Sequence, residues 1–181
     1  MHSETAPVWA QSFSGRRVIV YCRDGGNVSQ GTAAWLRQAG IDAQTLEGGF
    51  AAWRQADQPL LCIDRLPARD QTGRTTWVTR ARPKIIRIAC PWLIRRFIDP
   101  TAVFLYVAPA EVADVADRFG ATPFDIENVF WSNRGKLCTF DVMVEEFGLP
   151  TEALDRLATI GRGADTDAHD QAPHAAGLSA A

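Results

Sequence analysis

The feature that most constrains the fold of this chain is an apolar run that passes directly into a glycine-rich loop and then into a helical pattern. Residues 16–22 (RRVIVYC) are apolar and β-branched, as in a buried parallel strand. Residues 23–27 (RDGGN) form the loop, and residues 28–40 (VSQGTAAWLRQAG) predict a helix with Ser29 as its N-cap and Gly40 at its end. A strand, a loop and a helix in this order predict a parallel α/β fold.

The following segments repeat this alternation on a small scale. A second short strand and a Gly-Gly turn are predicted within residues 41–49, and a short helix at 50–56. An amphipathic helix is expected earlier, at 5–13. Residues 1–63 are therefore predicted to be one small α/β unit, and the polar residues 64–76 a linker. Two strands are too few to bury a sheet on both faces.

Residues 77–181 differ in composition, because aromatic, aliphatic and basic residues are mixed within them. They predict a second small α+β domain. Its expected elements are a strand at 76–80, a helix from about 91 to 98, a strand at 102–108, a helix at 109–120, a hairpin at 128–140, and helices at 141–148 and 151–161. The fold class predicted for the whole chain is α/β, a partial parallel unit followed by this second domain.

Composition excludes several functional classes. The 181 residues carry a net charge of −2, which argues against non-specific binding to nucleic acid. No apolar run approaches the roughly 18–20 residues that cross a bilayer. The N-terminus lacks the charged start and apolar core of a secretory signal. We therefore expect a cytoplasmic protein that contacts neither membrane nor nucleic acid and needs no cofactor.

The four cysteines lie far apart in the sequence and form no CxxC pair, so neither a zinc knuckle nor a thioredoxin-type motif is expected. In a reducing compartment they are predicted to be free thiols. Cys62 follows two leucines and is interpreted as core or linker. The remaining question is which cysteine is reactive.

Cys22 is the candidate because it lies where a strand ends and a loop opens onto a helix N-terminus. Gly25 and Gly26 allow the loop backbone to turn inward, so that several N–H groups converge on the sulfur. Such an environment is expected to lower the thiol pKa below its usual value of about 8.5. Arg23 adds a cation suited to an oxyanion donor.

The sequence leaves two other interpretations of Cys22. Cysteine-dependent phosphatases and arsenate reductases share this geometry, but they need an Arg six residues after the cysteine, where this chain has Val28. The second alternative is an inert core thiol, which would give the glycine-rich loop no purpose.

The stretch VIVYCRDGGNVSQGTAAWLRQAGIDAQTLEGGFAAW resembles the active-site half of the rhodanese family. The Cys22 loop and the later LEGGFAAW segment (46–53) carry the resemblance together. It implies a ping-pong sulfurtransferase that takes sulfur from a thiosulfate-like donor, holds it on Cys22 as a persulfide, and passes it to a thiol or cyanide-like acceptor. It also implies a substrate-binding cradle formed by Arg23, Asp24, Gly25, Gly26, Asn27 and Val28.

The resemblance does not extend to the first half of that family, because only about 20 residues precede the strand that leads to Cys22. We expect that another chain or domain completes the sheet, for example in a homo-oligomer, or that the chain is a truncated gene product.

The second half resembles the C-terminal domain of the ChrB chromate-resistance family. The matching stretches are WVTRARPKIIRIACPWLIRRFIDP (77–100), FLYVAPAEV (104–112), GATPFDIENV (120–129), RGKLCTFDVMVEEFGL (134–149) and RGADTD (162–167). This chain has Ile86 and Asn133 where the family usually has Asp and His, and it is shortened at the C-terminus. The resemblance implies a role in chromate stress, with chromate as a further possible ligand.

Two charged sets in this half could bind ions. Arginine forks suit tetrahedral oxyanions, and the candidates are Arg80, Arg82, Lys84 and Arg87. The alternative is that Arg87, Arg95 and Arg96 form a solvated helix face. A weaker hypothesis is an oxygen-rich metal site made by Asp141, Glu145, Asp165 and Asp167, against the alternative of a solvated acidic face. His169 and His174 are interpreted as surface residues of the C-terminal tail.

The leading functional hypothesis is therefore a rhodanese-type sulfurtransferase linked to chromate resistance. The main alternative is a non-enzymatic module that senses chromate or another oxyanion and carries a degenerate rhodanese part. A third interpretation, a non-functional fragment, was also considered.

Overall fold

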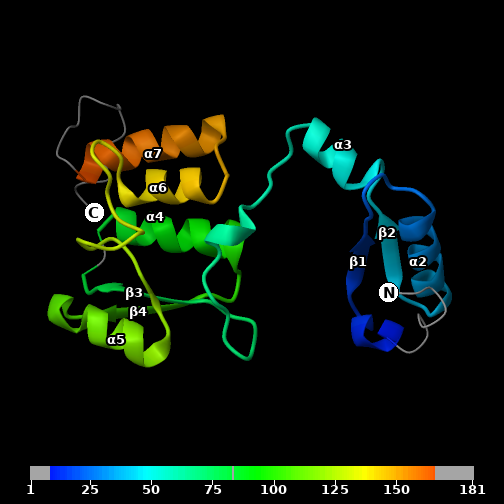
Figure 1. Cartoon of the computed structure of the whole chain (residues 1–181), viewed down its shortest axis with the longest axis horizontal. Helices are drawn as coiled ribbons and strands as arrows, with labels where there is room; N and C mark the ends of the chain where they lie inside the picture. Colours follow the sequence, from blue (N-terminus) through cyan, green and yellow to red (C-terminus); the bar gives the residue numbers. More distant parts are fainter. Residues whose placement is uncertain (1–8, 83, 166–181) are drawn as a thin grey trace. The chain divides into compact units, whose positions relative to one another are not determined.

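The structure, a computed structural model, describes residues 9–82 and 84–165 and divides the chain into two compact units, Met1–Leu60 and Leu61–Ala181 (Figure 1). The predicted division into 1–63, 64–76 and 77–181 differs from it only around the junction and stays a prediction. Among the described residues, no helix is long and apolar enough to cross a membrane.

The first unit is a minimal parallel α/β arrangement. Its elements are η2 (Gln11–Phe13), β1 (Arg17–Val20), α2 (Asn27–Gln38), β2 (Asp42–Thr45) and α3 (Gly49–Gln55). Strands β1 and β2 pair in parallel from Arg17 opposite Asp42 to Val20 opposite Thr45. The predicted α/β class is therefore confirmed. Helix α2 ends as expected, because Gly40 adopts a φ of +80° and the Ile41 N–H returns to the Leu36 carbonyl.

Helix α2 covers one face of this two-stranded sheet. Ala33 and Leu36 of the helix are buried against the side of the sheet that carries Val18 and Val20. Strand side chains alternate between the faces, so Ile19 points to the other face, where it is 61% exposed. That another chain or domain completes this sheet stays a prediction.

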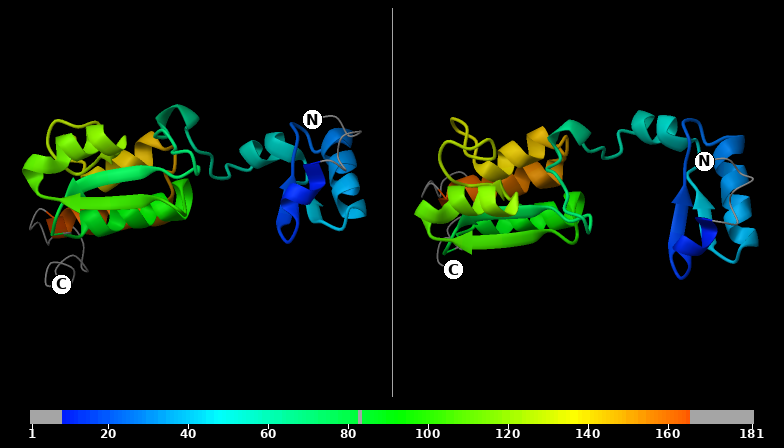
Figure 2. Two further views of the ribbon diagram at one scale, coloured as in Figure 1. Left: turned by 90° about the horizontal axis from the view of Figure 1, so that it is seen from below. Right: turned by 60° about the horizontal axis from the view of Figure 1, so that its bottom comes forward.

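The second unit is a three-layer arrangement around a parallel sheet. Its elements are η3 (Ile63–Arg65), β3 (Thr76–Arg80), α4 (Ile86–Leu93), the π-helix η4 (Ile94–Ile98), β4 (Val103–Val107), η5 (Pro109–Glu111), α5 (Val112–Phe119), β5 (Thr122–Pro123), α6 (Thr139–Glu146) and α7 (Glu152–Asp165). The strand order is β4-β3-β5, with both pairings parallel. Helix α5 lies on one side of the sheet and α4, α6 and α7 on the other (Figure 1), and both views of Figure 2 show β3 and β4 side by side.

Alternate residues of β3 supply the cores on the two faces of the sheet. Trp77 packs in the large core beneath α4 and α6, where its ring meets that of Phe124 edge to face. Val78 points the other way and packs with Val112 of α5. Because all three strands are parallel, their carboxyl ends meet at one edge of the sheet.

The helix expected at 91–98 begins five residues earlier than predicted, at Ile86, and Pro91 lies inside it. A proline has no N–H to donate one turn back, which leaves the carbonyl of Arg87 without its helical partner. The hydroxyl of Tyr106 on β4 donates to that carbonyl at 3.3 Å. The tertiary contact thus replaces the lost helical hydrogen bond, and a proline in this place does not mark a helix start.

The hairpin predicted at 128–140 is wrong. The segment contains one isolated antiparallel bridge, Arg134 to Leu137, around the left-handed Gly135. Asn133 does not make a turn of a hairpin. Its side-chain oxygen instead accepts the N–H of Thr139 at 2.8 Å, at the start of α6. The two-residue strand β5 was not expected from the sequence.

Candidate functional site

Cys22 lies two residues beyond the end of β1 and five before the start of α2. Its side chain is partly exposed. The sulfur lies 3.2 Å from the Ser29 hydroxyl oxygen and 3.6 Å from Oδ1 of Asp24. The alternative of a buried, inert thiol therefore does not fit the structure.

The surroundings of the sulfur favour its anionic form. The pKa of Cys22 is lowered, first by the hydrogen bond from the Ser29 hydroxyl and then by the backbone N–H of Ser29. Burial raises the pKa but is outweighed, and the N–H groups of Asp24 and Gly26 lower it further. A loop of backbone donors facing a sulfur stabilises thiolate over thiol, and the thiolate is the nucleophile.

The loop keeps its carbonyl groups away from the sulfur by bonding them to helix α3. The Cys22 carbonyl accepts the N–H of Phe50 at 2.9 Å, and the Arg23 carbonyl accepts the N–H of Ala51 at 2.8 Å. These are free donors of the first helical turn. One element therefore satisfies the loop carbonyls, and the loop N–H groups of Asp24 and Gly26 can point to the sulfur.

Glycines allow the two segments to meet backbone against backbone. Gly25 has a φ of +69°, and a Cβ there would lie 2.8 Å from the N atoms of Gly48 and Gly49. A Cβ on Gly49, which has a φ of +61°, would lie 2.4 Å from the Cys22 carbonyl oxygen. Neither position has room for a side chain. The LEGG segment, far from Cys22 in sequence, is thus the floor of the loop.

Ser29 is the functional residue that sequence reasoning misplaced. It was predicted as an N-cap, which is wrong, because α2 begins at Asn27 and its N-cap is Gly26. Ser29 lies in the first turn, is 1% exposed, and donates to the Gly26 carbonyl at 3.1 Å. Its single hydroxyl hydrogen can serve that carbonyl or the sulfur. A serine in the first helical turn after a cysteine loop was the available signal.

The remaining cradle candidates present side chains to solvent. Arg23, Asp24, Asn27 and Val28 are exposed, and Gly25 and Gly26 are partly buried in the loop. Val28 is 71% exposed, and it occupies the place where a phosphatase loop would need its arginine. The role of these residues in substrate binding stays a prediction.

The four oxyanion candidates of the second unit are not gathered around one point. Arg80 lines a pocket. Arg87 is buried, with its Nε 3.6 Å from Oδ2 of Asp125, so it is not part of a solvated helix face. Arg82 and Lys84 are exposed, and neither lines that pocket. An oxyanion site made by these residues stays a prediction.

Asp141, one of the metal candidates, is already engaged by protein groups. Its Oδ2 accepts the N–H and the S–H of Cys138, both at 2.9 Å, and its Oδ1 accepts from Arg162. Burial, together with the hydrogen bond to Asp141, raises the pKa of Cys138 to about 12. Cys138 is therefore a neutral donor and not a nucleophile.

The other metal candidates do not join Asp141 in the described part of the chain. Glu145 is exposed, and the side chain of Asp165, with Asp167, His169 and His174, lies outside the described residues. Across 9–82 and 84–165, no three His, Cys, Asp or Glu side chains gather as metal ligands would. The metal site stays a prediction.

The first unit places a cysteine beside backbone donors between a parallel strand and a helix, and its residues 2–56 match the rhodanese-like domain family. Residues 77–181 match the family described as "ChrB, C-terminal domain". This match spans more than half of the chain, which therefore belongs to the ChrB C-terminal domain family.

Two curated proteins are similar to parts of this chain. Protein ChrB of Cupriavidus metallidurans is 40% identical over 87 residues, which are 46% of this chain and 25% of that protein. A tRNA 2-selenouridine synthase of Alcanivorax borkumensis is 47% identical over 58 residues, 31% of this chain and 16% of that protein. The matched parts are thus a quarter or less of the relatives' lengths. No solved structure matches the chain.

Proposed function

We propose that this protein is a rhodanese-type sulfurtransferase, with Cys22 as the sulfur carrier, that acts in chromate resistance. The observation that carries the proposal is the environment of the Cys22 sulfur, where a hydroxyl and backbone N–H groups lower the pKa. The same donors suit a persulfide, which is also an anion. The match to the rhodanese-like domain family and the chalcogen chemistry in the name of the selenouridine synthase relative support this assignment.

The proposed reaction has two steps. The Cys22 thiolate attacks the outer sulfur of thiosulfate, so that a new S–S bond forms, the S–S bond of the donor breaks, and sulfite leaves with the electron pair. A nucleophilic acceptor such as cyanide then attacks the outer sulfur of the persulfide. The persulfide S–S bond breaks, thiocyanate is released, and Cys22 returns as the thiolate. No proton or external oxidant is needed to balance either step.

The test is cyanolysis by the purified full chain with thiosulfate as donor. Wild type is expected to form thiocyanate catalytically, and mass spectrometry is expected to show one added sulfur on Cys22 after exposure to thiosulfate alone. Cys22→Ser is expected to abolish both signals. Cys62→Ser is the matched control, because Cys62 is an exposed, free cysteine outside the loop. Thiocyanate formation that survives in Cys22→Ser, or that is missing in wild type, would reject the proposal.

The connection to chromate rests on the ChrB C-terminal domain and on the ChrB relative. It is tested in a chromate-sensitive bacterium that expresses either wild type or Cys22→Ser at equal levels. Wild type is expected to raise chromate tolerance and the variant to lose that effect. Equal protection by both would separate chromate resistance from sulfur transfer and would favour the alternative of a non-enzymatic sensing module.

A further inference from the structure

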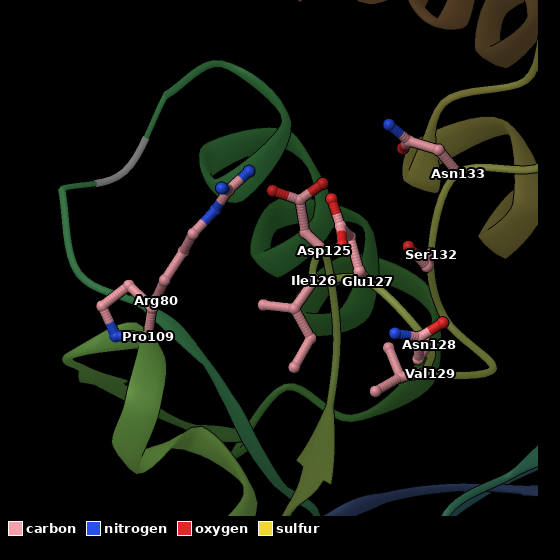
Figure 3. A pocket seen from close by; sticks show the side chains of 9 residues that line it. All are labelled: Arg80, Pro109, Asp125, Ile126, Glu127, Asn128, Val129, Ser132 and Asn133. Atoms are coloured by element: carbon pink, nitrogen blue, oxygen red, sulfur yellow. The ribbon is translucent and has the colours of Figure 1, made fainter.

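A pocket of about 890 Å³ opens at the carboxyl edge of the parallel sheet in the second unit. Arg80 is the last residue of β3, and Pro109 and Asp125 each follow shortly after the end of β4 and β5. Figure 3 shows the Arg80 side chain rising from one wall of the pocket, with the carboxylates of Asp125 and Glu127 beside it. Parallel sheets characteristically bind ligands at this edge, and the volume lies in the range of small-molecule sites.

Two charged side chains of the pocket, one cation and one anion, are left to interact with a ligand. Asp125 pairs with the buried Arg87, and its Oδ1 accepts the hydroxyl of Thr139 at 2.9 Å, so this carboxylate is already balanced. Arg80 and Glu127 are exposed, and within the described residues neither forms an ion pair. The pocket therefore offers one uncommitted positive and one uncommitted negative group.

Asn133 adds a donor of fixed orientation. Its side-chain oxygen accepts the N–H of Thr139 at 2.8 Å. The same oxygen lies 2.9 Å from the Thr139 hydroxyl, whose single hydrogen can go to Asn133 or to Oδ1 of Asp125. With the oxygen occupied, the amide NH2 is the end left to a ligand. Asn133 lies in the pocket wall beside Ser132, whose hydroxyl is a further polar group there. These donors lie on the opposite side of the pocket from Arg80 in Figure 3.

We propose that this pocket binds a small zwitterion of the amino-acid type. The carboxylate of the ligand binds Arg80, its ammonium group binds Glu127, and the Asn133 amide donates to the ligand from the opposite side of the pocket. A ligand with both charges leaves neither side chain unpaired when water is displaced. An inorganic dianion such as sulfate or chromate would match Arg80 but would meet repulsion from Glu127, which makes Glu127 a selectivity element.

The first test is thermal shift and calorimetry on the full chain with the twenty amino acids, each at millimolar concentration. At least one is expected to raise the melting temperature and to bind. Its N-acetyl derivative, which lacks the cation, and its amide, which lacks the anion, are each expected to bind at least tenfold more weakly. Failure of every amino acid to bind overturns the proposal, as does a derivative that binds as tightly as its parent amino acid.

Variants then assign the binding to the pocket. Arg80→Gln and Glu127→Gln are each expected to weaken amino-acid binding at least tenfold without changing the melting temperature of the free protein, because both side chains are exposed. Arg82→Gln and Glu152→Gln, exposed and outside the pocket, are the matched controls. If sulfate or chromate binds more tightly to Glu127→Gln than to wild type and no amino acid binds either protein, the zwitterion proposal is wrong and the pocket is an anion site.

Discussion

At the scale of single residues, two cysteines of this chain show how surroundings decide chemistry. Cys22 is partly exposed beside a hydroxyl and backbone donors, which lower its pKa. Cys138 is buried and donates to the Asp141 carboxylate, and its pKa is raised to about 12. The thiolate form is therefore favoured at Cys22 and disfavoured at Cys138. The difference in pKa between the two residues comes from their neighbours, since both carry the same thiol.

Ser29→Ala tests the largest of these contributions. Removing the hydroxyl removes the first cause of the lowered pKa, so the pKa of Cys22 rises and the thiolate fraction at neutral pH falls. We expect alkylation of Cys22 by iodoacetamide to slow several-fold at pH 7, and the pH at which the rate rises to move upward. The measurement is the alkylation rate against pH by mass spectrometry, with Cys62 in the same molecule as the reference.

Ser12→Ala is the control for this change, because Ser12 is exposed and its hydroxyl donates to the carbonyl of Trp9. It is expected to leave the profile of Cys22 unchanged. Identical profiles for Ser29→Ala and wild type would mean that the hydroxyl serves only the Gly26 carbonyl, its other partner.

The position of Cys22 between a strand and a helix could be predicted from the sequence, and its main partner, Ser29, could not. Cys22 stands between a recognisable strand and a glycine-rich loop, so its position was visible. The role of Ser29 depends on whether this residue precedes the helix or lies in its first turn, because that decides whether its side chain caps the helix or faces the loop. Helix ends vary by one or two residues between equally plausible assignments, and here that uncertainty decides the chemistry.

At the scale of elements, the active loop depends on α3 as much as on α2. Helix α3 begins at Gly49, which lies directly against the Cys22 loop. Two N–H groups of its first turn donate to the loop carbonyls of Cys22 and Arg23. The loop conformation is therefore a product of two segments that are separated by the whole of α2 and β2.

Gly49→Ala is expected to disrupt this contact. The left-handed φ of +61° costs a non-glycine residue about 1–2 kcal/mol, and the added Cβ would lie 2.4 Å from the Cys22 carbonyl oxygen, so the loop must move. Since a displacement of about 1 Å can lower an enzymatic rate ~100-fold, we expect thiocyanate formation to fall by about tenfold or more. The measurement is the cyanolysis rate, and a thermal melting curve of the same variant shows whether it is folded.

Gly31→Ala provides the opposite case within α2. No heavy atom lies within 4 Å of a Cβ built there, and alanine is favoured over glycine in a helix by about 1 kcal/mol. It is expected to keep full activity and to stabilise the first unit slightly. Normal cyanolysis by Gly49→Ala would contradict the assignment of the LEGG segment as the floor of the loop.

The elements that sequence patterns predicted well are those whose apolar pattern matches a local rule. The strand at 76–80 and the stop at Gly120 agree with the structure to the residue. The predicted start of α4 was wrong because Pro91 lies inside the helix, where the hydroxyl of Tyr106, distant in sequence, donates to the Arg87 carbonyl. The hairpin failed because the Asn133 side chain bonds to Thr139 instead of leaving the backbone to pair. In both cases a tertiary hydrogen bond overrides the local signal.

At the scale of the whole molecule, the two units have separate hydrophobic cores. The core of the first unit consists of residues from 9 to 43, and the two clusters of the second unit begin at Leu61. Two polar contacts with α6 and the residue after it hold the start of the second unit in place. The Cys62 N–H donates to the Phe147 carbonyl, and Arg65 pairs with Glu146 at 2.9 Å. Residues 61–66 are thus a structural part of the second unit.

Limited proteolysis of the full chain tests this organisation. Residues 56–60 are all exposed and lie between the end of α3 and the first residue that packs on the second core, so a protease of low specificity is expected to cut there first. The product should begin near residue 61 and should resist further digestion. Arg65→Ala, which removes the ion pair and the contact with the Phe130 ring, should allow cutting to spread into 61–66, whereas Arg54→Ala should not. First cuts inside 61–66 in wild type would show that this segment is a linker after all, because a segment bonded to a core has to detach before a protease can bind it.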